Sequence, residues 1–349
     1  MSRLRRADVS LPGITRRRRG RGFEYLDETG ERITDEETVD RIRELAIPPA
    51  WKDVWICPFP NGHIQATGMD AAGRKQYRYH ERWRERRDQE KYDEMLEFAR
   101  VLPRMRERLD EHLALDGLPR EKALACATRL LDRGFFRVGG EGYAASNESF
   151  GLATMLKEHV RVADGAIEFD YPAKSGRRLV RAIVDPEVFE IVQTLKRRRG
   201  GGDELLAYKT GRRWIDVRSE DINGYIKAIA GEDFSAKAFR TWNATLLAAV
   251  ALAVSGVVAG ASKTARKRAK TRAVNEVAHY LGNTPTVARA SYIDPRVFDR
   301  FDAGLTIGPA VAGLVDGEGV GEPHLQKQLE SAVLDLIGEE PSDEVEKVA

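Results

Sequence analysis

An uncharged stretch of 22 residues, 241–262, constrains the fold of this chain more than any other feature. In a sequence with 32% charged residues, such a run is long enough to cross a membrane or to form the centre of a soluble domain. The stretch is rich in alanine and contains Asn243, and these residues add little to membrane insertion. We therefore predict a buried core helix that breaks at Ser255-Gly256 and continues as a loop, and we expect no membrane partner.

The charges are distributed unevenly along the chain. Residues 1–22 have eight arginines against one aspartate, and residues 316–349 have ten acidic residues against two lysines. Without this acidic end, the rest of the chain has a net charge of +10. A basic body with an acidic terminus is typical of a protein that binds a polyanion. Charged ends that are merely solvated explain the same distribution equally well.

Cysteine and histidine usage argues against a disulfide framework and against a bound metal. Cys57 and Cys126 form no CxxC motif, and we expect buried or inert thiols in a reducing compartment. The six histidines are scattered, and no HxxxH or HExxH pair is present. The N-terminal residues are charged and no apolar core follows them, so we expect no secretory signal. The prediction is a cytoplasmic protein without a metal or other cofactor.

Residues 23–82 are predicted to form a small β-rich domain that follows a basic arm of residues 1–22. The segment GFEYLDETGERI alternates around a DETG turn, which predicts a hairpin. A second strand pair is predicted in VWICPFPNGHIQATGMD and RKQYRYH, with Asn61-Gly62 as the turn. Between these pairs, DEETVDRIRELA has the spacing of a helix, which Pro48-Pro49 ends.

Residues 83–306 are predicted to form a second domain that is mostly α-helical. The strand-like segments AIEFDY and RRLVRAIV flank a tight connection at 172–176, which predicts a small antiparallel sheet. After a long charged helical segment, helices are predicted at 120–136, 149–160, 186–199 and 219–230. Residues 307–349 form an acidic tail that we expect to be poorly ordered. The predicted fold class is therefore α+β.

The first of three segments that could support chemistry is FFRVGGEGY, residues 135–143. Arg137 follows two aromatic residues, and the glycine pair after it lets the backbone come close to a large partner. A helix that ends in a Gly-Gly cap explains the same pattern without any function. The segment therefore marks Arg137 as a candidate without identifying a ligand.

The second segment is FSAKAFRTWNATLLAAVAL, residues 234–252. Lys237 and Arg240 are three residues apart and share a face at the start of the apolar helix. Two cations beside a buried helix need an anion, and a planar guanidinium matches the oxygens of a phosphate two at a time. A lysine at the surface and an arginine paired with a nearby carboxylate are an equally common arrangement.

The third segment is HYLGNTPTVARASYIDP, residues 279–295. Thr284-Pro285 is a favourable helix start, with threonine as the N-cap and proline at the first helical position. Asn283 lies just outside that start, and Tyr292 follows about two turns later. A tyrosine that packs on the core is the alternative, as for most tyrosines.

Together and in this order, the three segments resemble the catalytic core of type IB DNA topoisomerases. The shared pattern is KxxR before an alanine-rich apolar helix, then LGN-TP and a tyrosine nine residues after the asparagine. The similarity covers roughly residues 15–305 and includes RRRRGRGFEY, GRKQYRY and SFGLATMLKEHV. It is strongest to the compact poxvirus-type enzymes of viruses and bacteria. Tyrosine recombinases share the layout but normally have HxxR and LGH.

The resemblance implies catalytic roles for five residues. Arg137 and Arg240 match the two arginines that clamp the scissile phosphate, and Tyr292 matches the nucleophile. Lys174, in the turn PAKSG, matches the lysine that protonates the leaving 5′ oxygen. Asn283 stands where many relatives have histidine. Asparagine can donate a hydrogen bond but cannot relay a proton, so its expected role is hydrogen bonding only.

The resemblance also implies contacts with DNA. Lys237 would reach the phosphate or the adjacent backbone. The further candidates are Gln76, Tyr77 and Tyr79 of the smaller domain, and Tyr143 of the larger one. The resemblance further implies a monomer that clamps duplex DNA at the nucleoid.

The implied activity is relaxation of positive and negative supercoils without ATP. A tyrosine that attacks a phosphodiester keeps the bond energy in a 3′-phosphotyrosyl ester, which the returning 5′ hydroxyl can reverse. One alternative is a site-specific tyrosine recombinase, which Lys237 and the β-rich N-terminal domain disfavour. Another is a DNA-binding protein that retains the scaffold without catalysis.

Overall fold

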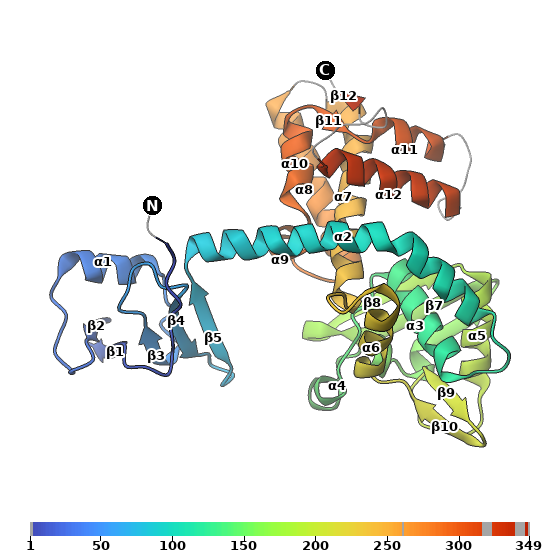
Figure 1. Ribbon diagram of the computed structural model, residues 1–349, viewed down its shortest axis with the longest axis horizontal. Helices are drawn as coiled ribbons and strands as arrows, with labels where there is room; N and C mark the ends of the chain where they lie inside the picture. Colours follow the sequence, from blue (N-terminus) through green and yellow to red (C-terminus); the bar gives the residue numbers. More distant parts are fainter. Residues whose placement is uncertain (1–2, 260–261, 316–322, 339–345, 348–349) are drawn as a thin grey trace. The chain divides into compact units, whose positions relative to one another are not determined.

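The computed structural model describes residues 3–259, 262–315, 323–338 and 346–347 (Figure 1). The chain folds into two units, residues 1–93 and 94–349. Helix α2 (Glu81–Leu113) spans the division between them. The boundary that we placed after residue 82 falls in the first turn of this helix. Trp83 packs edge-on against His63, with ring centroids 4.8 Å apart, and this contact ties the start of α2 to the first unit.

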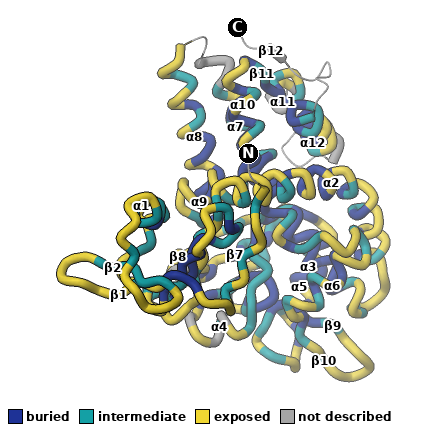
Figure 2. The backbone as a smooth tube through the Cα atoms, turned by 60° about the vertical axis from the view of Figure 1, so that its left-hand side comes forward, coloured by how far each residue is buried: buried dark blue, intermediate teal, exposed yellow. Residues whose placement is uncertain are grey.

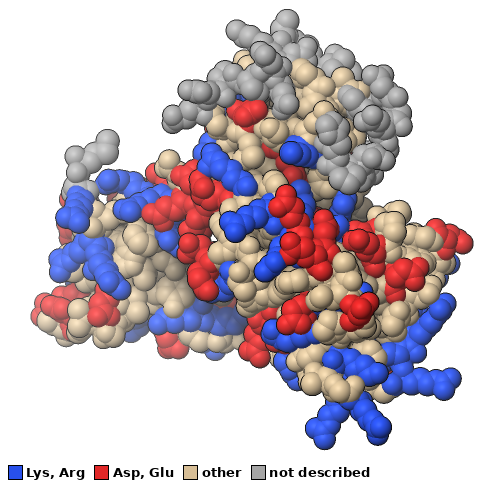
Figure 3. Space-filling model, turned by 45° about the vertical axis from the view of Figure 1, so that its right-hand side comes forward, with Lys and Arg blue, Asp and Glu red and all other residues tan. Residues whose placement is uncertain are grey.

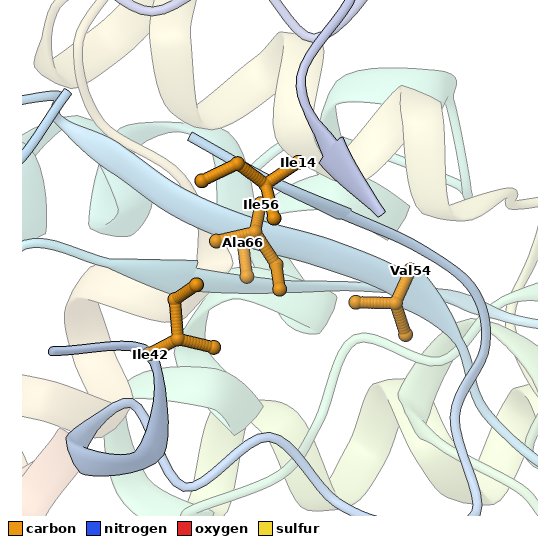
Figure 4. Packing of buried hydrophobic residues seen from close by; sticks show 5 residues of the cluster. All are labelled: Ile14, Ile42, Val54, Ile56 and Ala66. Carbon is orange, nitrogen blue, oxygen red and sulfur yellow. The ribbon is translucent and has the colours of Figure 1, made fainter. Parts of the chain in front are cut away.

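A five-stranded antiparallel sheet with the order β2-β1-β3-β4-β5 forms the centre of the first unit. The strands are β1 (Ile14–Arg19), β2 (Gly22–Leu26), β3 (Lys52–Ile56), β4 (Ile64–Met69) and β5 (Lys75–Tyr79), with α1 (Glu36–Glu44) between β2 and β3. Alternate apolar side chains of the sheet pack against α1. The buried cluster consists of Ile14, Ile42, Val54, Ile56 and Ala66 (Figure 4).

The basic arm predicted for residues 1–22 is wrong in part, because Ile14–Arg19 is a strand of this sheet. Successive side chains of a strand point to opposite faces, so its arginines have different environments. Arg16 is half-buried and donates hydrogen bonds of 2.8–3.2 Å to backbone carbonyls of the segment after α1. Arg17 is exposed and forms an ion pair with Glu24 on β2 at 2.6 Å. These arginines therefore hold the sheet together on both faces.

The predicted strand pairs of the first unit are partly confirmed. The second pair is present, since β3 pairs with β4 and β4 pairs with β5. The DETG turn closes only a single bridge between Leu26 and Arg32, because the main partner of β2 is β1. The predicted helix is α1, and it ends at Glu44 before the two prolines.

The second unit is mostly helical and contains small antiparallel sheets, which confirms the α+β prediction. Its helices after α2 are α3 (Arg120–Gly134), α4 (Glu141–Asn147), α5 (Pro186–Arg197), α6 (Ser219–Ala230), α7 (Ala236–Ala259), α8 (Lys263–Leu281), α9 (Pro285–Ser291), α10 (Pro295–Asp302), α11 (Gly308–Val315) and α12 (Pro323–Ile337). The strands are β6 (Val160–Ala163), β7 (Ala166–Ala173) and β8 (Arg177–Ile183) in one sheet, β9 (Ala207–Thr210) with β10 (Arg213–Asp216), and β11 (Leu305–Thr306) with β12 (Glu346–Lys347).

Helix α7 contains most of the uncharged segment of the sequence, and it lies in the core of the second unit. By length and composition it could cross a membrane, but 61% of its apolar window is buried within the fold. It packs against α3, α8, α10, α11 and α12, as the buried stretches of these helices show (Figure 2). The predicted break at Ser255-Gly256 is wrong, since α7 continues to Ala259. One glycine costs a helix only about 1 kcal/mol, which packing can offset.

The helix predicted at 149–160 is absent. This segment contains two short 3₁₀ turns, η1 (Leu152–Thr154) and η2 (Lys157–His159), and then enters β6. Its backbone crosses the segment after α3 closely, because a Cβ at Gly151 would lie 2.5 Å from the Cα of Gly139. This close crossing takes precedence over local helix propensity.

The chain after residue 306 contains two helices, although we expected a poorly ordered tail. Helices α11 and α12 pack on the core, and Leu325, Leu329 and Val333 are buried at a four-residue spacing. Such spacing forms one apolar face of a helix, which we overlooked among the acidic residues. The rest of the tail, residues 316–322, 339–345 and 348–349, lies outside the described part of the chain.

Candidate active site

Arg137 lies in an extended segment that begins where α3 ends. Phe135 adopts a left-handed conformation with φ of 56° and turns the chain out of the helix. The carbonyls of Arg137 and Val138 accept hydrogen bonds of 2.8 and 2.7 Å from the segment that contains η1. Gly139, with φ of 89°, permits the crossing with Gly151 described above. The backbone of Arg137 is therefore fixed on both sides.

Arg240 connects the ends of two other helices from its position on α7. Its side chain is buried, with 4% exposure, and donates hydrogen bonds to the carbonyl of Phe135 and, at 2.9 Å, to that of Leu281 on α8. Burial and the charge of Arg137 lower the pKa of Arg240 to about 10, although Tyr292 opposes this shift. The guanidinium therefore remains charged at neutral pH.

Asn283 follows the C-terminus of α8, where Gly282 adopts a left-handed conformation with φ of 61°. Its Oδ1 accepts a hydrogen bond from Arg137, and its carbonyl accepts one of 2.8 Å from Arg177 on β8. Because Oδ1 is occupied, the free group of the amide is its Nδ2 donor. The side chain can therefore donate a hydrogen bond to an anion beside Arg137.

Tyr292 is the residue at which α9 ends. The helix begins as predicted, because Thr284 accepts a hydrogen bond from the Val287 amide at 3.3 Å and Pro285 occupies the first turn. The Tyr292 carbonyl accepts a hydrogen bond from Thr245 on α7 at 3.3 Å. The guanidinium carbon of Arg240 lies 5.2 Å from the centroid of the Tyr292 ring. Arg240 thus contacts the phenol that the resemblance predicts to be the nucleophile.

Two tyrosines near these arginines ionise differently. Burial opposes ionisation of Tyr292, but the charge and hydrogen bonding of Arg240 and the charges of Arg137 and Lys237 outweigh it, so the pKa of Tyr292 is lowered. Tyr171 on β7 is 2% exposed, and burial raises its pKa despite nearby arginines. Among these two phenols, only Tyr292 is in a site that favours the phenolate.

Several hydrogen-bond donors of the site have no partner among the described residues. They are Nη1 of Arg137, Nε of Arg240 and Nδ2 of Asn283, and all three are buried. Arg129 and Arg198 also have an unpartnered Nε, but each forms an ion pair with an aspartate. A buried donor without a partner costs roughly 1–3 kcal/mol. An anion with several oxygens would satisfy the three donors together.

Comparisons with known proteins agree with this arrangement. Residues 80–302 match the family model described as eukaryotic DNA topoisomerase I, catalytic core, and residues 22–70 match that of the bacterial DNA topoisomerase IB N-terminal domain. The chain is 30% identical over 290 residues to DNA topoisomerase 1B of Acanthamoeba polyphaga mimivirus, which covers 81% of this chain and 85% of that protein. This chain belongs to the type IB DNA topoisomerase family.

A plant relative matches a shorter part of this chain. DNA topoisomerase 1 of Daucus carota is 26% identical over 129 residues, 36% of this chain and 15% of that protein. The family acts on DNA, and the phosphates of the DNA backbone are anions with several oxygens, of the kind that these donors could bind.

The two lysines predicted for the topoisomerase site are exposed. Lys237 lies one turn before Arg240 and is close enough to lower the pKa of Tyr292. Lys174 occupies η3 (Lys174–Gly176), the turn between β7 and β8. Among the described residues, Lys174 forms no hydrogen bond or ion pair with the other residues of the site, so its role stays a prediction.

The predicted DNA contacts outside this site also stay predictions. Tyr77 and Tyr79 are 42% and 40% exposed on β5 of the first unit, and their rings stack with centroids 5.9 Å apart. Gln76 donates a hydrogen bond of 3.0 Å to Asp70. Tyr143 is part of α4, and its side chain lies outside the described residues.

Sequence reasoning missed two arginines on β8 that hold the end of α8. Arg177 donates to the carbonyl of Asn283, and Arg181 donates to the carbonyl of Tyr280. Carbonyls at the end of a helix lack partners within the helix, so these contacts fix the chain next to the site. The alternation of RRLVRAIV could have shown that the two arginines share a face, although it does not identify their partners.

Proposed function

We propose that this protein is an ATP-independent DNA topoisomerase that relaxes positive and negative supercoils by cutting and resealing one strand. The observation that supports this most strongly is the group of unpartnered buried donors of Arg137, Arg240 and Asn283 next to a tyrosine with a lowered pKa. Fixed donors that oppose developing charge are a major source of catalysis at phosphorus.

In the proposed cleavage step, the phenolate oxygen of Tyr292 attacks the scissile phosphorus. A bond forms between this oxygen and phosphorus, and the bond from phosphorus to the 5′ oxygen breaks. Arg137 and Arg240 oppose the charge on the two nonbridging oxygens. One phosphoester replaces another in the 3′-phosphotyrosyl intermediate, so religation needs no ATP.

The departing 5′ oxygen needs a proton, and Lys174 is the residue that we assign to deliver it. Its exposed position on a hairpin turn would let it approach bound DNA. General-acid catalysis of this kind contributes roughly 10²- to 10⁴-fold to a rate. In religation the same lysine would accept the proton from the returning 5′ hydroxyl.

Asn283 is assigned to hydrogen bonding alone. Arg137 occupies its Oδ1, which leaves Nδ2 to donate to a nonbridging oxygen. An amide does not titrate near neutral pH, so the site would lack the pH dependence that a histidine introduces.

Strand rotation requires that the protein hold the duplex through the backbone during the lifetime of the intermediate. We propose that a monomer does this, with Lys237, Tyr143 and the β5 residues Gln76, Tyr77 and Tyr79 in contact with DNA. Torsion itself would drive rotation, so supercoils of either sign would be substrates. We expect the protein in the cytoplasm, at the nucleoid.

The decisive experiment combines plasmid relaxation with trapping of the covalent adduct. The wild-type protein should relax a supercoiled plasmid without ATP and, after denaturation on nicked DNA, should remain linked to a 3′ end. Tyr292→Phe removes only the nucleophilic oxygen and should abolish the adduct while DNA binding persists. An adduct that survives in Tyr292→Phe rules out this nucleophile, and joining of strands between two duplexes would indicate a recombinase instead.

A further inference from the structure

Three arginines from different segments meet at the end of α8. The carbonyls of residues 281–283, which we name the LGN turn, accept hydrogen bonds of 2.9, 3.3 and 2.8 Å from Arg240, Arg137 and Arg177, in that order. Arg240 and Arg137 are the two arginines assigned to the scissile phosphate. Arg177 belongs to β8, the strand that follows Lys174. The LGN turn therefore joins both phosphate ligands to the hairpin that contains Lys174.

Charge neutralisation does not account for Arg177. Positive and negative side chains are mixed over the middle of the face of the second unit in Figure 3. The neighbouring exposed Arg178 follows this pattern, because it forms an ion pair with Asp170 on β7. Arg177 is also exposed, but it forms no ion pair with a described residue and donates instead to the carbonyl of Asn283. Its contact is therefore with the site and not with a surface carboxylate.

Strand β8 lies along the end of α8 through three alternate residues, which share one face of the strand. Arg177 is the first of them, and Arg181, the last, donates a hydrogen bond to the carbonyl of Tyr280. Between them, Leu179 packs so closely that a Cβ at Gly282 would lie 2.9 Å from its side chain. These contacts fix the register of β8 against the LGN turn.

Arg177 is the contact of β8 that is nearest to Lys174. In the ladder between β7 and β8, Arg177 pairs with Ala173, which leaves the three-residue loop 174–176. Gly176 has a φ of 69°, as is typical of the last position of such a loop. The Cα atoms of a cross-strand pair are about 5 Å apart. Because Lys174 directly follows Ala173, the place of its backbone depends on where Arg177 is held.

We propose that Arg177 is a positioning residue that fixes the turn of Lys174 relative to the scissile phosphate. This role rests on the proposed function. Arg177 acts through Lys174, because it holds the hairpin against the LGN turn, whose other carbonyls hold Arg137 and Arg240. The proton donor and the two phosphate ligands thus share one point of attachment.

The step that depends on this position is the departure of the 5′ oxygen. As the bond between the Tyr292 oxygen and phosphorus forms, the bond from phosphorus to the 5′ oxygen breaks. The ammonium of Lys174 transfers a proton to that oxygen and becomes a neutral amine. In religation the amine takes the proton back from the 5′ hydroxyl. A proton donor must come within hydrogen-bond reach, so a small displacement of the turn reduces the rate.

The test compares two esters that differ only in the leaving atom. One is the normal oxygen ester at a mapped cleavage position, and in the other sulfur replaces the bridging 5′ oxygen. A thiol has a pKa of about 8.5, so a thiolate can leave without a proton. Single-turnover adduct formation is measured for Arg177→Gln. The matched control, Arg161→Gln, also removes one arginine from this sheet, but that arginine is paired with Glu168 at 2.7 Å.

We expect Arg177→Gln to slow adduct formation on the oxygen ester by roughly 10- to 100-fold, part of what a general acid contributes. On the sulfur ester its rate should equal that of the wild type, and the control should keep both rates. Lys174→Ala should show the same pattern with a larger loss. Adding Arg177→Gln to Lys174→Ala should cause no further loss, because the two residues act as a unit. Arg177→Lys, which can still donate to the carbonyl, should recover part of the rate.

An equal loss on both esters would overturn the proposal, because Arg177 would then act on the phosphate or on the fold. An unchanged rate on the oxygen ester would overturn it too. So would a Lys174→Ala variant that is slowed equally on both esters, since there would be no proton donor to position. A wild type that forms no adduct with either ester refutes the proposed function instead.

A second measurement does not depend on activity. Amide hydrogen exchange of the peptide 172–178 should be faster in Arg177→Gln than in the wild type and in Arg161→Gln, while the rest of the chain exchanges as before. Unchanged exchange of this peptide would show that Arg177 does not hold the hairpin, whatever the outcome with the two esters.

Discussion

Two largely buried arginines of the second unit, Arg106 and Arg240, differ in the groups that surround their charge. Arg106 donates four hydrogen bonds of 2.7–2.9 Å to Asp132 and Glu330. Arg240 has no carboxylate partner among the described residues, and it donates to two backbone carbonyls and to the Tyr292 phenol. Burial opposes both charges, but the two carboxylates outweigh it and raise the pKa of Arg106, whereas the pKa of Arg240 falls to about 10.

The difference separates a cluster that stabilises the fold from a site that is complete only with an anion. Asp132 and Glu330 neutralise Arg106 and join α2 to α3 and α12, so this cluster needs no ligand. Arg240 has a phenol beneath it and an unpartnered Nε, with a second arginine nearby. Two uncompensated guanidiniums near each other are costly unless an anion binds between them.

Among the substitutions that test this contrast, Arg240→Ala should have the largest effect on activity. We expect the rate of adduct formation to fall by about 10³- to 10⁵-fold, since a guanidinium that opposes transition-state charge is lost. The free energy of unfolding should change by less than about 2 kcal/mol, because the hydrogen bonds that are lost join an arginine to neutral groups and no ion pair is broken. Single-turnover adduct formation and urea unfolding measure the two quantities.

Arg240→Lys, which keeps the charge but not the planar fork, should recover part of the rate. A rate loss below tenfold in Arg240→Ala would refute the catalytic assignment.

The converse is expected for Glu330→Ala. Removal of this carboxylate leaves Arg106 with one partner, and we expect a loss of about 2–3 kcal/mol in the free energy of unfolding. The rate of adduct formation per folded molecule should stay within a few-fold of the wild type. Glu330→Gln keeps the side-chain shape and should lose less stability. If the alanine variant is as stable as the wild type, α12 does not depend on this ion pair.

The sequence predicted best what local signals determine. Thr284-Pro285 begins α9 as expected, and the alternation around 172–176 does form β7 and β8. The Arg106–Glu330 pair could not be predicted, because 224 residues separate its members and many acids could have been the partner. The helix expected at 149–160 failed for a similar reason, since the crossing of Gly139 and Gly151 is a tertiary contact.

For the site, the ordered motifs identified the residues but not their environment. The structure brings Arg137, Arg240, Asn283 and Tyr292 together, and their catalytic roles stay predictions. The motifs do not show that Arg240 holds the ends of α3 and α8, or that its Nε has no partner. These properties arise from packing between distant segments.

A smaller effect is expected for Lys237→Gln, which tests how the phenol is ionised. Lys237 helps to lower the pKa of Tyr292, so its removal should raise that pKa and reduce the phenolate fraction at neutral pH. We expect adduct formation to slow by a few-fold near neutral pH. The rate should approach that of the wild type as the pH rises toward the pKa of free tyrosine, which is about 10. Rate profiles of the two proteins measure this. A loss of rate that is equal at every pH would show that Lys237 acts by contact with DNA instead.

The smallest effect is expected for Asn283→His. This substitution replaces an amide, which does not titrate near neutral pH, with an imidazole, which does. An imidazole ordinarily titrates near pH 6.5, so the rate profile should gain an inflection in that region. The two flanking guanidiniums disfavour a third positive charge and should shift the inflection to lower pH. At alkaline pH the neutral imidazole can still donate one hydrogen bond, as Nδ2 of asparagine does, so the rate should stay within about tenfold of the wild type.

Asn283→Ala, which cannot donate, is the control. A histidine variant whose profile has the same shape as that of the wild type would show that position 283 does not contact the reacting phosphate.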